Sequence, residues 1–373
     1  MTKPEVGIGL IGAGFMGRCH ANAFRAVGGL FDLPVAPKLS MLADVTPVAA
    51  ERSAAALGFG RYTADWRALV ADPEIDIVAI TAPNRLHEPI ALEAIACGKT
   101  VYCEKPLAPT AAACKRMTES AEEKGILTLV GFNFLRNPMI ALAREIIESG
   151  EIGQVTSFRG RHAENYMCDP TTPHSFRTDR VGGGALADIG SHILSMARFL
   201  LGPIQRVNGT CHTIHSMRPK DAGGSELAPV EVDDMCHAIL QFENGAQGSI
   251  EANWAATGRT MDLSFEVTGT KGAIVFSQER MNELLLWSPS TLGRAGFSRI
   301  EAGPDHPPYQ NFCPAPGHHL GFNDLKVVEV AGLLTAWAGG PRTGTDFREA
   351  WAVQKTVEAI AAASELGAWQ DIN

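Results

Sequence analysis

The sequence lacks three features that would place it in a special class of proteins. Its 8 cysteines include no Cys-x-x-Cys pair, so we expect reduced thiols rather than disulfides or a zinc site. No stretch approaches the roughly 20 apolar residues of a membrane helix. It has no Lys/Arg-rich run, and its 41 acidic and 32 basic side chains give a net charge of -9. We therefore expect no metal, no membrane span and no nucleic acid partner.

The N-terminus also lacks the pattern of a secretory signal. The chain enters the strand-like run 6–11 without a basic stretch or a long apolar core, so we expect a cytoplasmic protein. Hydrophobic residues make up 45% and charged residues 20% of the chain, as in an ordinary globular protein. A length of 373 residues fits two domains.

The first third of the chain alternates short β-rich runs with alanine-rich helical stretches. This alternation predicts an α/β fold with a doubly wound parallel sheet, a Rossmann domain at residues 1–131. The expected strands are 6–11, 39–43, 77–81, 100–103 and 127–130.

After about residue 131 the pattern changes to strands joined by turn residues, which predicts a second α/β domain at 132–373 with an antiparallel sheet. The expected strands are 155–161, 206–214, 235–242, 246–254, 262–269 and 272–277. Residues 291–320, rich in Gly, Pro and His, are expected to form a long loop. Two helices, about 322–339 and 346–366, would close the fold, and the last could pack back on the first domain.

A glycine-rich turn follows the first expected strand and opens a helix. Gly12 permits a tight turn, Gly14 lets the backbone approach a pyrophosphate, and Gly17 allows close packing of the helix. The N-terminus of that helix, which carries Phe15 and Met16, would bind the phosphates. The sequence therefore predicts a dinucleotide site.

Asp44 ends the second expected strand, where a carboxylate accepts hydrogen bonds from the adenosine ribose and repels a 2′-phosphate. NAD is therefore favoured over NADP. Asp44 lies about 30 residues past Gly14 rather than the usual ~20, so we interpret residues 28–37 as an insertion. The alternative is that Asp44 caps the helix that starts near residue 47.

Two further segments carry chemistry: Cys-Glu-Lys-Pro at 103–106, and Gly-Gly-Gly-Ala-Leu-Ala-Asp-Ile-Gly-Ser-His at 182–192. With the glycine turn, they resemble the glucose-fructose oxidoreductase and inositol dehydrogenase (Gfo/Idh/MocA) family of NAD(P)-dependent enzymes, which act on sugars and cyclitols. The resemblance covers nearly the whole chain and includes segments 81–87, 131–138 and 150–155. Segments 163–192 and 321–327 resemble the branch of levoglucosan and sugar dehydrogenases.

The resemblance implies a Rossmann domain followed by an α/β domain with a large open, mostly antiparallel sheet, and a homodimer or homotetramer. It also favours Lys105 and His192 as an acid/base pair. Oxidising a secondary alcohol requires a base for the hydroxyl proton and a cation at the same oxygen, and these two side chains could supply both. Which of them takes the proton stays open, and His192 could instead be a capping or core histidine.

Asp188 lies four residues before His192, a spacing that on an α-helix would let it orient the imidazole or bind a substrate hydroxyl. Further cofactor candidates follow the third and fourth strands, where nucleotides bind in such sheets. These are Thr81, Ala82, Pro83, Asn84, His87, Glu104 and Lys105. Glu104 and Lys105 should flank the nicotinamide ribose, whereas His87 could cap a helix instead.

A last group of candidates lies in stretches that resemble the nicotinamide and sugar contacts of the family: Asn133, Tyr166, His174, Arg177 and Asp179. The fork of Arg177 could bind sugar oxygens or a carboxylate, with a surface salt bridge as the alternative. His318 has no Cys or carboxylate partner at ligand spacing, so we place it at the rim of the substrate pocket rather than on a metal.

The leading hypothesis is NAD-dependent oxidation of a secondary hydroxyl of a sugar, anhydrosugar, glycoside or cyclitol. An oxidoreductive glycosidase, which oxidises a ring carbon transiently and then eliminates the aglycone, would use the same residues. A non-catalytic dinucleotide sensor is a third hypothesis, and the joint presence of Lys105, Asp188 and His192 argues against it.

Overall fold

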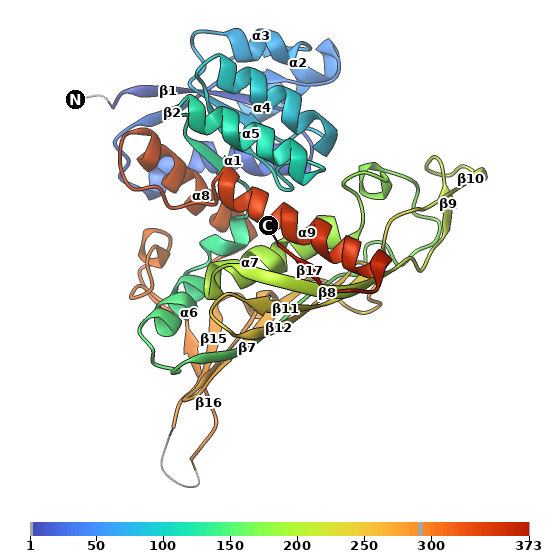
Figure 1. Ribbon diagram of the computed structural model, residues 1–373. Helices are drawn as coiled ribbons and strands as arrows, with labels where there is room; N and C mark the ends of the chain where they lie inside the picture. The colour runs from blue at the N-terminus through green and yellow to red at the C-terminus, as the bar shows by residue number, and fades with distance from the viewer. Residues whose placement is uncertain (1–2, 290–293, 373) are drawn as a thin grey trace. The chain divides into compact units, whose positions relative to one another are not determined.

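The computed structural model describes residues 3–289 and 294–372. The chain forms two compact units, one of residues 1–136 and 321–351 and one of residues 137–320 and 352–373 (Figure 1). The first unit contains a parallel sheet with helices on both of its faces. Its strands are, in spatial order, β3 (Arg61–Thr63), β2 (Ala36–Ala43), β1 (Glu5–Ile11), β4 (Ile77–Ile80), β5 (Thr100–Cys103) and β6 (Thr128–Val130).

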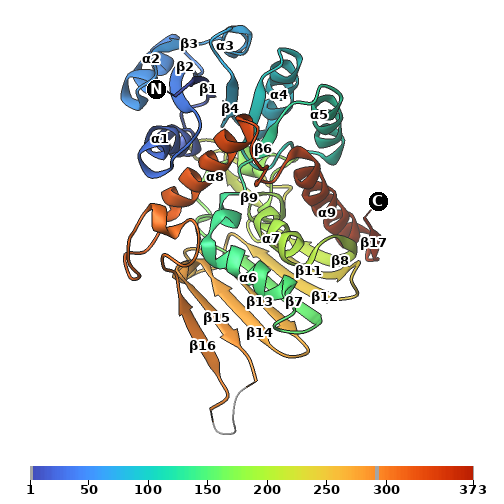
Figure 2. The same cartoon turned by 90° about the vertical axis from the view of Figure 1, so that its left-hand side faces the viewer.

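Some helices of this first unit begin at side chains that accept hydrogen bonds from exposed backbone donors. The hydroxyl of Thr46 accepts a hydrogen bond from the Ala49 amide at the start of α2, and Thr110 does the same for α5. Figure 2 shows α8 beside α1, with α4 and α5 on the other side of the sheet. The helices are α1 (Phe15–Leu30), α2 (Pro47–Leu57), α3 (Trp66–Ala71), α4 (His87–Ala96), α5 (Ala111–Glu123) and α8 (Phe322–Trp337).

The second unit is built on one large sheet, nine-stranded in the part of the chain that the structure describes. β7 and β12 pair in parallel, and the other pairings that the structure describes are antiparallel. In spatial order the strands are β16 (Phe297–Glu301), β15 (Glu283–Trp287), β14 (Ala273–Ser277), β13 (Asp262–Gly269), β7 (Val155–Ala163), β12 (Gln247–Asn253), β11 (Met235–Phe242), β8 (Ile204–His212) and β17 (Gln370–Asp371).

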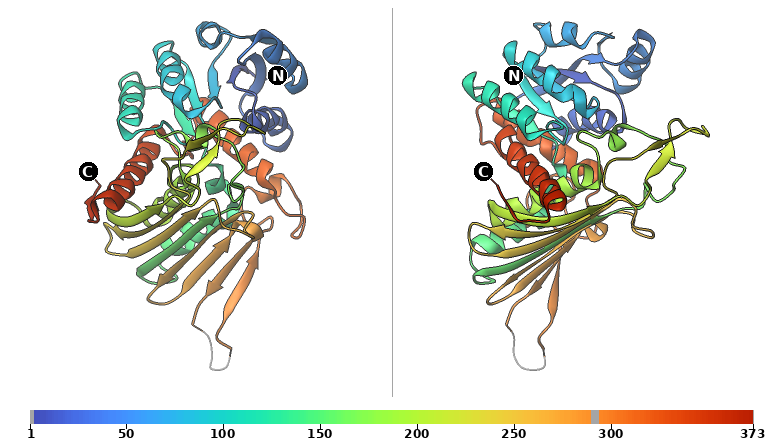
Figure 3. Two further views of the ribbon diagram at one scale, coloured as in Figure 1. Left: turned by 90° about the vertical axis from the view of Figure 1, so that its right-hand side faces the viewer. Right: turned by 45° about the vertical axis from the view of Figure 1, so that its right-hand side comes forward.

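Helices cover one face of this sheet and leave the other face bare, as both views in Figure 3 show. The covering helices are α6 (Pro138–Glu148), α7 (Ser191–Leu201) and, from residue 352 onward, α9 (Phe347–Leu366). Strand β11 shows the consequence in its alternation, because Cys236, Ala238 and Leu240 are buried while His237 and Ile239 are exposed. This is the period-two pattern of a sheet that is packed on one side.

The structure agrees with the strands expected from the sequence and adds several that were missed. β3, β15 and the pair β9 (Met217–Pro219) and β10 (Leu227–Pro229) are short and carry no strong alternation. The loop expected at 291–320 contains β16 and a 3-10 turn at 309–311, and residues 291–293 lie outside the described residues. β16 forms a strand because it pairs with β15, with Leu285 opposite Arg299.

Residues 321–351 lie in the first unit, whereas the pattern along the chain placed them with the second domain. The reason is tertiary. α8 packs against α1, and the amide of Val130 at the end of β6 donates to the carbonyl of Thr345 at 2.7 Å. Residues 321–351 thus complete the unit that contains the N-terminal strands, although they are far from those strands in the sequence.

Candidate active site

The glycine turn after β1 is built around three glycines with different surroundings. Gly12 has φ 97°, and a Cβ there would lie 2.8 Å from the carbonyl oxygen of Thr81. A Cβ at Gly17 would lie 2.2 Å from the carbonyl oxygen of Gly12. At Gly14, by contrast, no described atom other than those of its own chain neighbours lies within 4 Å of that position. Packing therefore demands glycine at 12 and 17, whereas position 14 faces open space at the start of α1.

This turn lies at the point where the strand order of the sheet reverses. The chain runs outward from β1 to β2 and β3 and then returns to β4 on the other side of β1. The Thr81 hydroxyl, just after β4, donates to the carbonyl of Gly12 at 2.7 Å, and the Gly12 amide donates to the carbonyl of Ala43 at 2.9 Å. Ligands of open α/β sheets bind at this place, and the open side of Gly14 fits the pyrophosphate of a dinucleotide there.

Asp44 follows β2 at the same edge of the sheet and is half-buried. Its carboxylate accepts a hydrogen bond from the Val45 amide at 2.8 Å, and the cap of α2 is Thr46. The alternative that Asp44 caps this helix is therefore wrong, because the hydroxyl two residues later fills that place. Asp44 stays available for the ribose contact that its position predicts.

His87 is buried at the first position of α4 and is not the cap of that helix. Its ring nitrogens lie 2.9 Å from the carbonyl oxygen of Pro106 and 2.8 Å from that of Ala82. Burial lowers the pKa of His87. The imidazole therefore ties the loop after β4, which continues through Pro83 and Asn84, to the loop after β5.

Asn133 opens the 3-10 turn at 133–136 and is 2% exposed. Its amide nitrogen has no hydrogen-bond partner among the residues that the structure describes. A buried amide donor without a protein acceptor costs free energy unless a ligand or water completes it. Asn133 thus fits the cofactor contact that the resemblance assigns to it.

Glu104 directs both of its oxygens to protein groups of the first unit. Oε1 lies 2.8 Å from Nε2 of His20 and 2.9 Å from Nζ of Lys326, and Oε2 accepts from the backbone amide of Lys105 at 3.2 Å. α8 brings Lys326 to Glu104 across the fold of the first unit, and the place of Glu104 beside the nicotinamide ribose stays a prediction. Lys105 itself is half-buried at the carboxyl end of β5.

In the second unit, Tyr166, Arg177 and Asp188 form one hydrogen-bonded cluster. Oδ2 of Asp188 accepts from the Tyr166 hydroxyl at 3.0 Å and from Nε of Arg177 at 3.0 Å. Burial, together with the Asp188 charge, raises the pKa of Tyr166, so the phenol remains a donor. The three residues are far enough apart in the sequence that their contact could not be predicted, and the fold brings Tyr166 and Arg177 to the carboxylate of Asp188.

Asp188 lies in a π-helical turn at 186–190, which leads into α7 and its second residue, His192. The α-helical spacing assumed from the sequence therefore does not apply between them. His192 is 7% exposed, and its ring centroid lies 5.5 Å from that of His162 on β7. His162 in turn lies 2.8 Å from Oε1 of Glu164 and 2.9 Å from the carbonyl of Ile189.

The remaining candidates of the second unit have different surroundings. His174 uses its ring nitrogens on the carbonyl of Ala228 at 3.2 Å and the hydroxyl of Thr178 at 3.0 Å, which fixes a turn. Asp179 is exposed. His318 is exposed in the Gly/Pro segment and lies 3.1 Å from the carbonyl of Ala315. Neither of the two histidines joins the cluster around Asp188.

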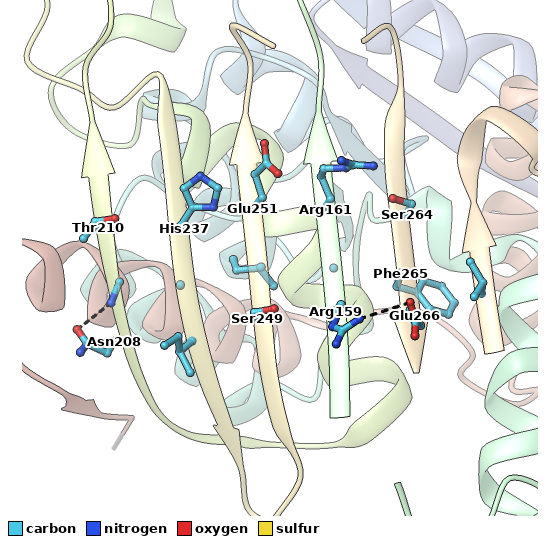
Figure 4. Close-up of a pocket in the computed structure, with 16 residues that line it drawn as sticks. Arg159, Arg161, Asn208, Thr210, His237, Ser249, Glu251, Ser264, Phe265 and Glu266 are labelled. Carbon is cyan, nitrogen blue, oxygen red and sulfur yellow. Dashed lines mark hydrogen bonds and ion pairs between the residues drawn. The ribbon is translucent and has the colours of Figure 1, made fainter. Parts of the chain in front are cut away.

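The bare face of the large sheet carries a shallow hollow of about 670 Å³ (Figure 4). Its lining residues come from six neighbouring strands, β8, β11, β12, β7, β13 and β14, and carry both charges, with Arg159 3.9 Å from Glu266. Arg161, His237 and Glu251 belong to the same face. None of the residues predicted for catalysis lines this hollow.

The described residues contain neither a metal-binding cluster nor a membrane-spanning helix. Across 3–289 and 294–372, no group of three or more His, Cys, Asp or Glu side chains is placed to hold a metal ion. Over the same ranges, no helix has the length and apolar character needed to cross a membrane.

The chain matches known families and proteins over nearly its whole length. Residues 6–132 match the oxidoreductase family with an NAD-binding Rossmann fold, and residues 140–275 match the GFO/IDH/MocA C-terminal domain. Levoglucosan dehydrogenase of Pseudarthrobacter phenanthrenivorans is 36% identical over 99% of this chain and 98% of its own. Inositol 2-dehydrogenase of Rhizobium meliloti is 33% identical over 74% of this chain and 76% of its own.

A solved structure supports the same relationship. Levoglucosan dehydrogenase in complex with NADH and L-sorbose has a TM-score of 0.96 to this chain, with 36% identity over 99% of each chain. These findings confirm the resemblance, the α/β fold class with its Rossmann domain, and NAD as the cofactor that the sequence predicted. The chain belongs to the GFO/IDH/MocA family and is one of its NAD-binding oxidoreductases.

Proposed function

We propose that the protein oxidises a secondary hydroxyl of a sugar, anhydrosugar, glycoside or cyclitol to a ketone with NAD. The observation that carries the proposal is the place of Lys105, directly after β5, at the edge of the sheet that also holds the open Gly14 turn. A half-buried lysine at that edge can reach the oxygen of a bound alcohol. The full-length likeness to levoglucosan dehydrogenase makes anhydrosugars and pyranoses the first substrates to test.

Bound NAD supplies the hydride acceptor. In the proposed mechanism, Lys105 and His192 form the acid/base pair at the reacting hydroxyl, one accepting its proton and the other stabilising the oxygen. Asp188 is held by Tyr166 and Arg177, so its carboxylate would meet a substrate hydroxyl in a fixed position rather than move freely. The same fixed cluster gives Arg177 a positioning part in sugar binding.

The other assignments rest on position within each unit. We assign cofactor binding to the glycine turn with Phe15 and Met16, and to Asp44, Thr81, Asn84 and Asn133. Phe15 is 63% exposed at the start of α1, with its ring centroid 6.0 Å from that of Phe322. We also propose His174, Asp179 and His318 as substrate contacts, of which Asp179 and His318 are exposed.

An oxidoreductive glycosidase remains the alternative, because transient oxidation of a ring carbon would use the same acid/base pair. A screen of purified protein with NAD and a panel of levoglucosan, free pyranoses, inositols and aryl glycosides separates the two. NADH absorbance and product mass are followed together. Accumulating NADH with a ketone product supports the dehydrogenase, and aglycone release without NADH supports the glycosidase.

Lys105→Met tests the acid/base role. The variant keeps the length of the side chain but removes its proton chemistry, so kcat on the best substrate of the screen should fall by about 100-fold or more. NADH fluorescence titration checks that the variant still binds the cofactor. Turnover at the wild-type rate would remove Lys105 from the mechanism and leave the non-catalytic sensor as the better reading.

We also propose that two or four copies assemble through the bare face of the large sheet. The support is the mixed-charge hollow on that face together with the exposed Ile239 that lines it. Cytoplasmic location stays a prediction from the sequence.

A further inference from the structure

A lysine lies fully buried within the first unit. Lys326, on the first turns of α8, is 0% exposed, and its Nζ lies 2.9 Å from Oε1 of Glu104 and 2.8 Å from Oε2 of Glu329. Glu329 also accepts a short hydrogen bond from the hydroxyl of Tyr102, on β5. We call Lys326, Glu104, Glu329, Tyr102 and His20 the buried lysine cluster.

The charges of this cluster are fixed by their mutual contacts. Burial acts to lower the pKa of Lys326, but Glu104 and Glu329 raise it above its ordinary value. Burial acts to raise the pKa of Glu104, but Lys326 and then His20 hold it well below its usual range. Burial, with Lys326 adding to it, lowers the pKa of His20. His20 is therefore a neutral donor, and Lys326 supplies the positive charge opposite Glu104.

Glu104 is consequently held on both sides of its carboxylate. His20 and Lys326 fix Oε1, while Oε2 accepts from the amide of Lys105. Residue 131 passes so close that a Cβ on Gly131 would lie 2.5 Å from Oε1, which leaves Glu104 little room to move. The carboxylate thus links α8 to the main chain of Lys105.

A buried cluster of charges of this kind adds little to the free energy of unfolding. Replacing a buried ion pair by well-packed apolar side chains is often neutral or stabilising, because desolvation offsets the attraction between the charges. The hydrogen bond from the Lys105 amide to Glu104 suggests that the buried charges have a role other than stability. A fixed hydrogen bond to the backbone of a reacting residue limits where its side chain can reach.

We propose that Lys326 is a positioning residue for the reaction, acting through Glu104 on the main chain of Lys105. This rests on the acid/base role proposed for Lys105. Without the ammonium, Glu104 would lose the partner that opposes its charge, turn or take up a proton, and release the Lys105 amide. The geometry for proton transfer would loosen while the glycine turn that binds the cofactor stays intact.

The test compares Lys326→Met with Glu329→Gln, using the best substrate of the screen above. Lys326→Met should lower kcat per NADH-binding site by about tenfold or more, with KM for NAD within about threefold of wild type. Glu329→Gln is the matched control in the same cluster. It leaves the contact between Lys326 and Glu104 in place, and its kcat should stay within about threefold of wild type.

NADH titration and thermal melting separate this effect from a loss of folded protein. A Lys326→Met variant with wild-type kcat per binding site overturns the inference, as does an equal loss of kcat in Glu329→Gln. Should Lys326→Met fail to fold, Glu104→Gln decides. Its single carbonyl oxygen can face Lys326 or the Lys105 amide but not both, so unchanged kcat would overturn the inference too.

The Lys105→Met measurement keeps the two proposals apart. If Lys105→Met is inactive and Lys326→Met is not impaired, the acid/base role stands and the positioning role falls. If Lys105→Met is fully active, the proposed function falls first, whatever Lys326→Met does.

Discussion

Gly14 and Gly17 lie three residues apart in one turn, yet an added methyl group would meet different surroundings at each. At Gly17 it would lie 2.2 Å from the Gly12 carbonyl oxygen, while at Gly14 it would meet no described atom within 4 Å other than those of its own chain neighbours. The backbone of Gly14, at φ -65°, is one that alanine adopts without strain. The two positions therefore separate the needs of the fold from those of the ligand.

We expect Gly17→Ala to lower the melting temperature, at a cost on the order of 2 kcal/mol, because α1 must move away from the turn. Gly14→Ala should keep the wild-type melting temperature but weaken NADH binding by about tenfold or more, since its methyl group occupies the phosphate side. Calorimetry and fluorescence titration on both variants check this pair. Tight NADH binding by Gly14→Ala would contradict the placement of the pyrophosphate at this turn.

Two features at the residue scale show which contacts could be predicted from the sequence and which could not. The glycine turn was predictable because its residues are consecutive and their chemistry is local. The partner of Glu104 was not, because Lys326 is 222 positions away and lies in a largely apolar stretch of its helix. A charged residue inside such an apolar run, with Glu329 one turn later, is the signal that could have pointed to a buried ion pair.

At the scale of elements, the π-helical turn 186–190 begins at a hydrogen bond to the carboxylate of Asp233. Oδ2 of Asp233 accepts from the Leu186 amide at 2.8 Å at the start of this turn. A Cβ on Gly184 would lie 2.2 Å from Oδ1, so the chain wraps closely around the group. Burial raises the pKa of Asp233 to about 6, with a smaller contribution from the Asp234 charge.

This raised pKa sets the direction of a pH effect on stability. A carboxyl group whose pKa is higher in the folded than in the unfolded state stabilises the fold below its ordinary pKa of 3.8, and that contribution is lost as pH rises through about 6. Asp233→Asn cannot ionise and removes this loss. We therefore expect the melting temperature of wild type, relative to Asp233→Asn, to fall by about 2 °C or more between pH 4 and pH 7.

Thermal melts of both proteins across that pH range are the measurement. A difference in melting temperature that stays constant with pH would show that Asp233 does not titrate there.

The strands of the second unit also show why some elements were harder to predict from the sequence. β15 and β16 are joined through a segment with little alternation, and their strand character comes from pairing with each other and with β14.

At the scale of the whole molecule, the bare face of the large sheet carries the assembly prediction. Ile239 is 51% exposed within the hollow on this face, so a charge there would oppose burial against a second copy. Ile239→Glu should shift the protein toward monomers. Light scattering after size exclusion measures the mass, with Val48→Glu, at a 75% exposed site on α2, as the control.

An unchanged mass for Ile239→Glu, or a monomeric wild type, would contradict assembly through this face. An equal shift in Val48→Glu would show that any added surface charge has the same effect. The alternation along β11 predicts which side chains leave the core of the unit. It does not predict whether a second copy covers them, because a face exposed to water shows the same alternation.

The sequence by itself determined the parallel and antiparallel halves of the fold, the glycine turn, the NAD cofactor and the family. These follow from periodicity and from motifs whose residues lie close together in the chain. Only the tertiary structure decided that residues 321–351 complete the first unit, that Asp188 is shared by Tyr166 and Arg177, and that Lys326 holds Glu104. The physical reason is that hydrogen bonds and ion pairs depend on distances in space, which local patterns do not encode when the partners are far apart in sequence.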